Sequence, residues 1–281
     1  MGGYDRVGMG EQLEPISVEE MYGGTEEEGD AFEAALDESL HPRGPDMLFD
    51  VAAELGIGPG SVVLDVGCRD GRHSVELVRR SGCRVIGVEL VRANLDRRDR
   101  SAEVEPLPAY VQGRIEDLPL PDASVDLVWA RDMLIHVPDL ARAFQECRRV
   151  LRPDGTMLVF QMFATPWLEP GEAERLWPPL GVVPENTDPD RFEETLRAAG
   201  LSIARRDELR SEWRESGEED GDHRTSRQLL HAARLLRDRD RFLERFGRVA
   251  YQVELGNCLW GVYQMIGKLG PRVYVLKPSS A

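Results

Sequence analysis

The sequence predicts a doubly wound α/β fold, in which helices cover both faces of a mostly parallel sheet. From about residue 45 onward, apolar segments of strand length alternate with amphipathic segments of helix length. The strand-like segments are almost continuously apolar, which is typical of parallel strands that are buried on both faces. The first unit of this alternation is "VVLDVGCRDGRHSVELV", residues 62–78, which has the pattern of a strand, a tight turn and a helix.

The elements follow in order. Before the sheet, Ser17 with Glu20 three residues later forms the capping-box signal of a short helix in "SVEEMY". Further helices are predicted at residues 30–40, 45–56, 71–80, 91–100, 139–151, 189–200, 227–246 and 249–267. Strands are predicted at residues 61–66, 84–90, 109–113, 156–163, 201–209 and 272–278, and residues 121–130 supply a turn and another strand. A further turn is predicted at 152–155 and a polar loop at 212–223.

These elements divide the chain into four predicted parts. Residues 1–43 form a mobile or helical N-terminal segment, residues 44–210 the core, residues 211–270 a helical insertion, and residues 271–281 the last strand and tail. Because the insertion precedes the final strand, we expect it to lie over the carboxyl edge of the sheet and to act as a lid.

Composition limits the classes of function. The formal charge of −16 repels phosphate backbones and therefore disfavours nucleic acid as a partner, whereas small molecules are compatible with it. The N-terminal residues show no signal peptide, and no apolar stretch is long enough to span a membrane, so we expect a cytoplasmic protein. The four cysteines are scattered without metal-ligand spacing, and the preference for arginine over lysine indicates a bacterial source with a genome rich in G and C.

The turn in "LDVGCRDG" follows the first strand of the sheet, where ligands bind in folds of this class. In the glycine pattern of a dinucleotide site, this frame has Gly67, Arg69 and Arg72, so two of three glycines are missing and a nicotinamide cofactor is disfavoured. Asp65 instead offers a carboxylate to an ammonium group. Glu89, at the end of the second strand, can accept hydrogen bonds from both hydroxyls of a ribose, so the two carboxylates together predict a nucleoside that bears an amine.

With these residues the sequence resembles the class I S-adenosylmethionine-dependent methyltransferases, particularly the small-molecule branch related to ubiquinone and menaquinone biosynthesis. The resemblance runs from about Pro45 to Gln161. It includes "IEDLPLPDASVDLVWA", "DMLIHVPDLARAFQECRRVLRPDG" and "TMLVF", which are similar to the family's fourth strand, the helix and turn after it, and its fifth strand. The resemblance implies a Rossmann-like sheet of seven strands and S-adenosyl-L-methionine as the cofactor.

The resemblance also implies roles for residues of the cofactor site. The turn would hold the methionine end of the cofactor, Glu89 the ribose, and two residues after the third strand the adenine, with Arg131 near the methionine or the reaction centre. The implied cofactor contacts are Asp65, Gly67, Cys68, Arg69, Gly71, Glu89, Leu90, Ile115, Glu116 and Arg131. Two residues depart from the family pattern: Arg69 replaces the middle glycine of the turn, and Arg114 replaces an aspartate that faces the adenine amine.

Methyl transfer from a sulfonium requires alignment more than acid-base groups, so the sequence need not contain a base. His136 follows the fourth strand, where a neutral imidazole can remove a proton from an acceptor hydroxyl or amine, although a purely structural histidine is the alternative. The candidate substrate contacts are Asp132, Gln161, His231, Trp260 and Tyr263, of which the two aromatic residues alternatively pack the lid. The acidic runs lack the spacing of a calcium loop, so no metal site is predicted.

Two functional hypotheses follow. The first is a methyltransferase of bacterial secondary metabolism that methylates oxygen, nitrogen or carbon of a small metabolite. The second is a protein of the same fold that binds the cofactor without transferring the methyl, as a scaffold for another reaction such as cyclisation or as a ligand sensor. A weaker third reading is that Arg69 or Arg114 pairs with an altered, anionic cofactor.

Overall fold

The computed structural model describes residues 15–98 and 102–279. The chain divides into two compact units, and the boundary between them in the sequence lies between Pro42 and Arg43. The first unit contains helices α1 (Val18–Tyr22) and α2 (Glu26–Asp37), and neither helix has a buried residue. Both begin with a capping box, as expected for Ser17 and Glu20 of α1; in α2 the box of Thr25 starts the helix four residues before the predicted position.

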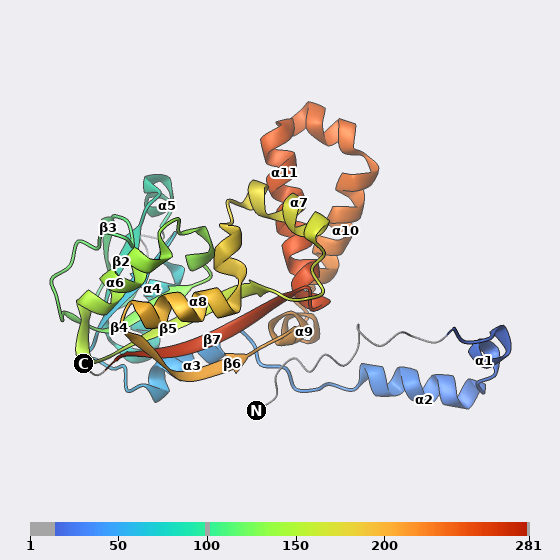
Figure 1. Cartoon of the computed structure of the whole chain (residues 1–281), viewed down its shortest axis with the longest axis horizontal. Helices are drawn as coiled ribbons and strands as arrows, with labels where there is room; N and C mark the ends of the chain where they lie inside the picture. Colours follow the sequence, from blue (N-terminus) through green and yellow to red (C-terminus); the bar gives the residue numbers. More distant parts are fainter. Residues whose placement is uncertain (1–14, 99–101, 280–281) are drawn as a thin grey trace. The chain divides into compact units, whose positions relative to one another are not determined.

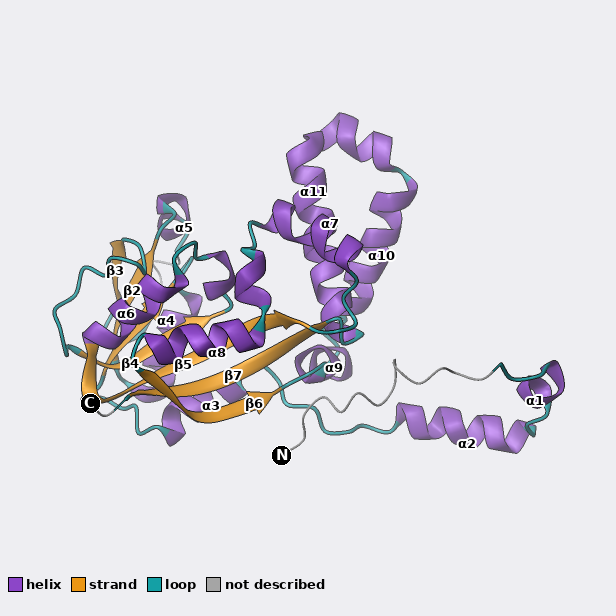
Figure 2. Ribbon diagram, viewed as in Figure 1, coloured by secondary structure: helices purple, strands orange, loops and turns teal. Residues whose placement is uncertain are grey.

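The second unit contains a seven-stranded sheet in the order β3-β2-β1-β4-β5-β7-β6 (Figures 1 and 2). Strands β1 to β5 pair in parallel, and β7 is antiparallel to both β5 and β6. The strands are β1 (Val62–Val66), β2 (Arg84–Glu89), β3 (Ala109–Gln112), β4 (Val125–Arg131), β5 (Leu151–Ala164), β6 (Leu201–Glu208) and β7 (Leu269–Pro278). This is the doubly wound, mostly parallel seven-stranded sheet that the sequence predicts.

Helices connect the strands and continue beyond β6. They are α3 (Met47–Glu54), α4 (Arg72–Ser81), α5 (Arg92–Asp96), α6 (Leu140–Val150), α7 (Pro170–Leu180), α8 (Pro189–Ala198), α9 (Glu212–Glu219), α10 (Arg224–Arg237) and α11 (Arg239–Met265), with short 3₁₀ helices η1 (Leu134–His136) and η2 (Pro184–Thr187). Helices α9 to α11 lie between β6 and β7, so the predicted helical insertion before the last strand is confirmed. No helix within residues 15–98 and 102–279 is long and apolar enough to cross a membrane.

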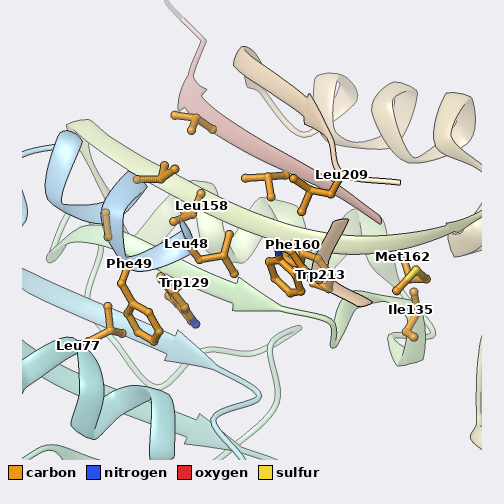
Figure 3. Packing of buried hydrophobic residues seen from close by; sticks show 14 of the residues in the cluster. Leu48, Phe49, Leu77, Trp129, Ile135, Leu158, Phe160, Met162, Leu209 and Trp213 are labelled. Carbon is orange, nitrogen blue, oxygen red and sulfur yellow. The ribbon is translucent and has the colours of Figure 1, made fainter. Parts of the chain in front are cut away.

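The sheet has a hydrophobic cluster on each face. Along β4, Leu127 and Trp129 belong to the cluster covered by α3 and α4, whereas Val128 belongs to the cluster covered by α6 and α8. This alternation follows from the two-residue period of a strand, and it explains why the parallel strands are apolar throughout. Figure 3 shows the first cluster, in which Phe49 stacks on Trp129 with ring centroids 5.0 Å apart.

Several local predictions were wrong. Residues 212–223 are not a polar loop throughout, because α9 buries Trp213 and Ser216 on one side while its other positions are polar. The predicted turn at 152–155 lies inside β5 as an irregularity, since Leu151 pairs with Val125 and Thr156 with Leu127. The helix predicted at 227–246 is interrupted at Asp238, and α11 is kinked at Gly247, whose φ is 80°. The predicted helix 91–100 is shorter in the structure, and its last two residues lie outside the described ranges.

Candidate active site

A cavity of about 1010 Å³ lies within the second unit, beyond the carboxyl ends of β1, β2 and β4. Ligands of open α/β sheets bind at this edge, because the loops after the parallel strands converge there. Three groups of residues line the cavity: the turn after β1, the loops after β2 and β3, and an inner part formed by the end of β4, by β5 and by the insertion helices. The predicted contacts among them are Gly67, Cys68, Arg69, Glu89, Leu90, Ile115, Glu116, Arg131, Asp132, His136 and Trp260.

The turn after β1 adopts left-handed backbone conformations at every second residue. The φ angles are 68° at Gly67, 53° at Arg69 and 76° at Gly71. Arg69 therefore keeps the conformation of the glycine it replaces, at a cost of roughly 1 to 2 kcal/mol. Gly71 does not line the cavity, but it is required for packing, because a Cβ there would lie 2.3 Å from the hydroxyl oxygen of Tyr110.

Glu89 joins two loops at the cavity wall. One carboxylate oxygen accepts a hydrogen bond of 3.0 Å from the backbone N–H of Arg69. The other accepts bonds from the N–H of Val91, at 2.9 Å, and from the amide of Asn94, at 3.3 Å. A carboxylate has about four acceptor positions, so Glu89 holds the turn in place and still has capacity for a hydroxyl of a ligand.

Asp65 lies behind the turn and does not line the cavity. Its side chain is buried and accepts a hydrogen bond of 2.6 Å from the Ser74 hydroxyl on α4. Burial raises the pKa of Asp65 to about 7, although the Ser74 bond and the charge of Arg131 oppose this rise. A cation placed nearby would favour the ionised form, so the predicted partnership with an ammonium group is electrostatically consistent.

The adenine side is formed by the residues that follow β3. Ile115 is buried and presents an apolar surface. Arg114 turns toward Glu116, and its guanidinium donates a hydrogen bond of 3.2 Å to the Glu116 carboxylate. The arginine that replaces the family aspartate thus orients a neighbouring acidic side chain at the cavity wall.

Arg131, at the end of β4, lies between the turn and the inner part of the cavity. Its guanidinium contacts Nε2 of His73 on α4, and it lies over the Trp213 ring, 5.4 Å from the ring centroid. Burial, together with the charges of Arg131 and Arg72, lowers the pKa of His73 to about 3, so this ring is neutral and can accept a hydrogen bond from Arg131. The His73 ring also lies near the rings of Phe49 and Trp129, with centroids 6.2 and 6.4 Å away.

Asp132 and His136 line the inner part of the cavity. Asp132 has a φ of 51°, and its Oδ1 atom is buried without a hydrogen-bond partner among the described residues. Burial raises the pKa of this carboxyl, and the nearby His136 and Arg131 counteract part of the effect. Nδ1 of His136 lies 3.0 Å from the carbonyl oxygen of Gly181, an arrangement in which Nδ1–H donates and Nε2 is free to accept a proton.

Helix α9 contributes residues that the sequence analysis missed. Trp213 stacks on Phe160 of β5, with ring centroids 4.0 Å apart and planes inclined by 3° (Figure 3). The following residue, Arg214, also lines the cavity, together with Gln264 of α11. A tryptophan and an arginine inside an otherwise acidic segment were the available signal, but the many charged and glycine residues around them favoured a loop.

Three predicted substrate contacts lie outside the cavity. Gln161 is fully buried and its amide donates a hydrogen bond of 3.1 Å to the carbonyl of Asn186, so it connects β5 to η2. Tyr263 packs against Lys268, whose amine lies 5.5 Å from the ring centroid. His231 is on α10, where its ring lies with Glu254 and Cys258 of α11, and ligand atoms of the three residues are within 4.8 Å of one another. Tertiary packing thus gives these three side chains protein neighbours and no position on the cavity wall.

Comparisons with known proteins agree with this geometry. Residues 64–159 match the model of the methyltransferase domain family. A sterol 24-C-methyltransferase of Gibberella zeae is 37% identical over 118 residues, which are 41% of this chain and 31% of the relative. The 27-O-demethylrifamycin SV methyltransferase of Amycolatopsis mediterranei is 30% identical over 156 residues, covering 54% of this chain and 57% of the relative. The chain therefore spans between about a third and just over half of the length of these curated relatives.

Solved structures support the fold over a larger part of the chain. A [4+2]-cyclase superposes with a TM-score of 0.64 at 23% identity, covering 84% of this chain and 82% of the other. A putative sarcosine dimethylglycine methyltransferase from Galdieria sulphuraria has the same TM-score at 19% identity, covering 84% of each chain. The matched residues include the turn after β1, Glu89 and the end of β4. The chain thus carries, over residues 64–159, a methyltransferase domain of the class I S-adenosylmethionine-dependent family, whose cofactor is S-adenosyl-L-methionine.

Proposed function

We propose that this protein is an S-adenosylmethionine-dependent methyltransferase that acts on a small metabolite at oxygen, nitrogen or carbon. The observation that carries the proposal is a single cavity that joins the turn and Glu89 to an inner part with its own polar and aromatic side chains. A cofactor and an acceptor can therefore occupy adjacent parts of one cavity. Helices α9 and α11 line the inner part, and this favours a compact acceptor that is aligned with the cofactor.

The residues present fit the cofactor. Gly67 is required at the turn, because its φ is 68° and a Cβ there would lie 2.9 Å from the Met133 side chain. In the proposal, Glu89 and Leu90 hold the ribose, Ile115 and Glu116 line the adenine, and Asp65 provides negative charge behind the turn, while Cys68 and Arg69 contribute to the wall. When bound, S-adenosylmethionine supplies a methyl group that is already activated on a sulfonium.

The protein's remaining task is to position the acceptor and manage its proton. Nε2 of His136 can accept a proton from an acceptor hydroxyl or amine, because Nδ1 is engaged with Gly181. Asp132 offers an unpaired oxygen for a donor group of the acceptor. Trp213, Trp260 and Phe160 supply apolar surface around these groups.

The biological setting belongs to the same proposal. A bacterial source is supported by the arginine-rich composition, and secondary metabolism by the similarity to the 27-O-demethylrifamycin SV methyltransferase of Amycolatopsis mediterranei. The chain is also similar to fungal sterol 24-C-methyltransferases, whose acceptors differ from rifamycin. Similarity alone therefore does not select the class of acceptor, and the experiment below identifies it.

The test combines binding and transfer. Calorimetry with S-adenosylmethionine and S-adenosylhomocysteine should show binding to the wild type that is weakened in Asp65→Ala and Glu89→Ala. The wild type is then incubated with trideuteromethyl-labelled cofactor and fractionated bacterial metabolites, and labelled products are sought by mass spectrometry, with Glu89→Ala as the control. Absence of cofactor binding would reject the proposal, and binding without labelled product would favour the second candidate.

The second candidate is a cofactor-binding protein of this fold that does not transfer the methyl. It is supported by the fold likeness to a [4+2]-cyclase, since this architecture is also found in a protein that closes rings. In that case S-adenosylhomocysteine, which lacks the methyl, would support the activity as well as S-adenosylmethionine does. A strict requirement for S-adenosylmethionine would exclude it.

A further inference from the structure

The inner part of the cavity contains two half-buried arginines on either side of Trp213. Arg131 lies over the tryptophan ring, and Arg214 is the next residue along α9. Among the described residues, neither guanidinium forms an ion pair with a carboxylate, because Arg131 contacts His73 and Arg214 contacts two glutamines. Charged groups removed from water are normally paired, so two unpaired cations at one wall indicate a place for negative charge.

Arg214 is held by neutral partners. Its Nε donates a hydrogen bond of 2.7 Å to the Gln264 side chain on α11, and its Nη1 donates one of 3.3 Å to the Gln228 side chain on α10. Gln228 is itself fixed by a bond of 3.1 Å from its amide nitrogen to the carbonyl of Asn257. Three helices thus orient the guanidinium without neutralising it, which leaves N–H donors available to a ligand.

The inner part of the cavity carries charged side chains of both signs. Arg131, Arg214 and Arg224 lie there with Asp132, Glu218, Asp220 and Asp222, but among the described residues no carboxylate forms an ion pair with Arg131 or Arg214. Burial lowers the pKa of Arg214, and the negative charges of Asp132, Asp222 and Glu218 oppose this effect without pairing directly with the guanidinium. An anion next to Arg214 would relieve the cost of the buried cation.

We propose that Arg214 binds a carboxylate or phosphate group of the methyl acceptor, and that Gln228 and Gln264 position its guanidinium. This inference rests on the proposed function, because it assigns the inner part of the cavity to the acceptor. Arg131 lies closer to the cofactor turn through His73, so an anion at that side can belong to the methionine carboxylate of the cofactor. The experiment therefore separates these two sources of negative charge.

The probes are inorganic phosphate and acetate, titrated by calorimetry at constant ionic strength. Protein saturated with S-adenosylhomocysteine should bind at least one probe, because the cofactor carboxylate is then already in place. Arg214→Gln should weaken this binding by about tenfold to 100-fold, as expected for the loss of a charge-assisted hydrogen bond. Arg227→Gln, which removes an equal charge from an exposed position on α10, should leave the affinity within twofold.

A second variant places a negative charge next to Arg214. Gln228→Glu keeps an oxygen next to Arg214 and supplies a negative charge, although it loses the bond to the Asn257 carbonyl, so it should abolish probe binding while the protein still unfolds cooperatively and still binds S-adenosylhomocysteine. If Arg214 only connects the helices and does not contact the anion, Gln228→Glu should bind the probes as the wild type does. Retained probe binding in this variant would therefore overturn the proposal.

Two further outcomes are decisive. If the probes bind only cofactor-free protein and compete with S-adenosylhomocysteine, the anion site belongs to the cofactor carboxylate and the assignment to the acceptor is rejected. If the S-adenosylhomocysteine complex forms but binds neither probe, the assignment is also rejected. In both cases the binding of S-adenosylhomocysteine is measured separately, so failure of this inference is distinguished from failure of the proposed function.

Discussion

Replacing Glu89 with glutamine tests the geometry of the proposed cofactor site. Both carboxylate oxygens of Glu89 accept backbone N–H groups, from Arg69 at 3.0 Å and from Val91 at 2.9 Å. The amide of glutamine has only one oxygen. Whichever way it turns, its NH₂ group faces one of these backbone donors, so at least one loop contact is lost.

The structure permits an estimate of the effect. A hydrogen bond to a charged group contributes about 1.5 to 3 kcal/mol, and Glu89→Gln removes both the charge and one loop contact. If a ribose hydroxyl also depends on this carboxylate, the dissociation constant for S-adenosylhomocysteine should rise by about tenfold to 150-fold. The free energy of unfolding should fall by a comparable amount because the turn loses its anchor.

Calorimetry with S-adenosylhomocysteine measures the affinity, and urea unfolding of the same preparation measures stability. Glu76→Gln is the matched control, since Glu76 lies on α4 outside the cavity and pairs with Arg79 and Arg80. Its effect on affinity should be negligible, as is usual for exposed ion pairs. A dissociation constant for Glu89→Gln within threefold of the wild type would refute the assignment of Glu89 to the cofactor.

Three further predictions concern other parts of the site. Burial raises the pKa of Asp65 to about 7 from 3.8. Between these two pH values the folded state binds a proton that the unfolded state has released, so the free energy of unfolding decreases as the pH rises through this range. Urea unfolding of cofactor-free protein at pH 5 and at pH 8 measures this decrease, which should be absent in Asp65→Asn. The same decrease in Asp65→Asn and in the wild type would show that Asp65 is not its source. Gly71→Ala should cost about 2 to 4 kcal/mol of unfolding free energy, from the left-handed φ and the clash with Tyr110, whereas Gly60→Ala, which meets no atom within 4 Å, should be near neutral in the same assay. His136→Gln should lower kcat by about 100-fold in the labelled-methyl assay while cofactor affinity stays within twofold; an unchanged kcat would leave His136 with a structural role alone.

The alternation of strands and helices was predictable because it depends on local periodicity. Parallel strands that are buried on both faces must be apolar throughout, and the intervening helices need one apolar stripe, so both signals are present in short windows of sequence. The turn after β1 was predictable for a related reason. Its left-handed positions favour glycine, and two of the three remain Gly67 and Gly71.

The insertion was harder to predict because its segments depend on distant partners. Helix α9 has few apolar residues, and it is stabilised by the stacking of Trp213 on Phe160 and by ion pairing between Arg43 and Glu212, far apart in the chain. Likewise, His231 and Tyr263 have plausible chemistry for a substrate site, but the packing of α10 and α11 directs them to Glu254, Cys258 and Lys268.

By itself the sequence determined the order of strands and helices, because this order follows from periodicity. It also located the ligand-binding turn, because that turn follows the first strand of the sheet and contains glycines at left-handed positions. Only the tertiary structure decided which side chains share the cavity wall. It placed Arg214 and Trp213 there and removed Gln161, His231 and Tyr263, since such contacts depend on how residues far apart in the chain pack together. The residues that line the acceptor part of the cavity could therefore be identified only from the packing of the insertion helices.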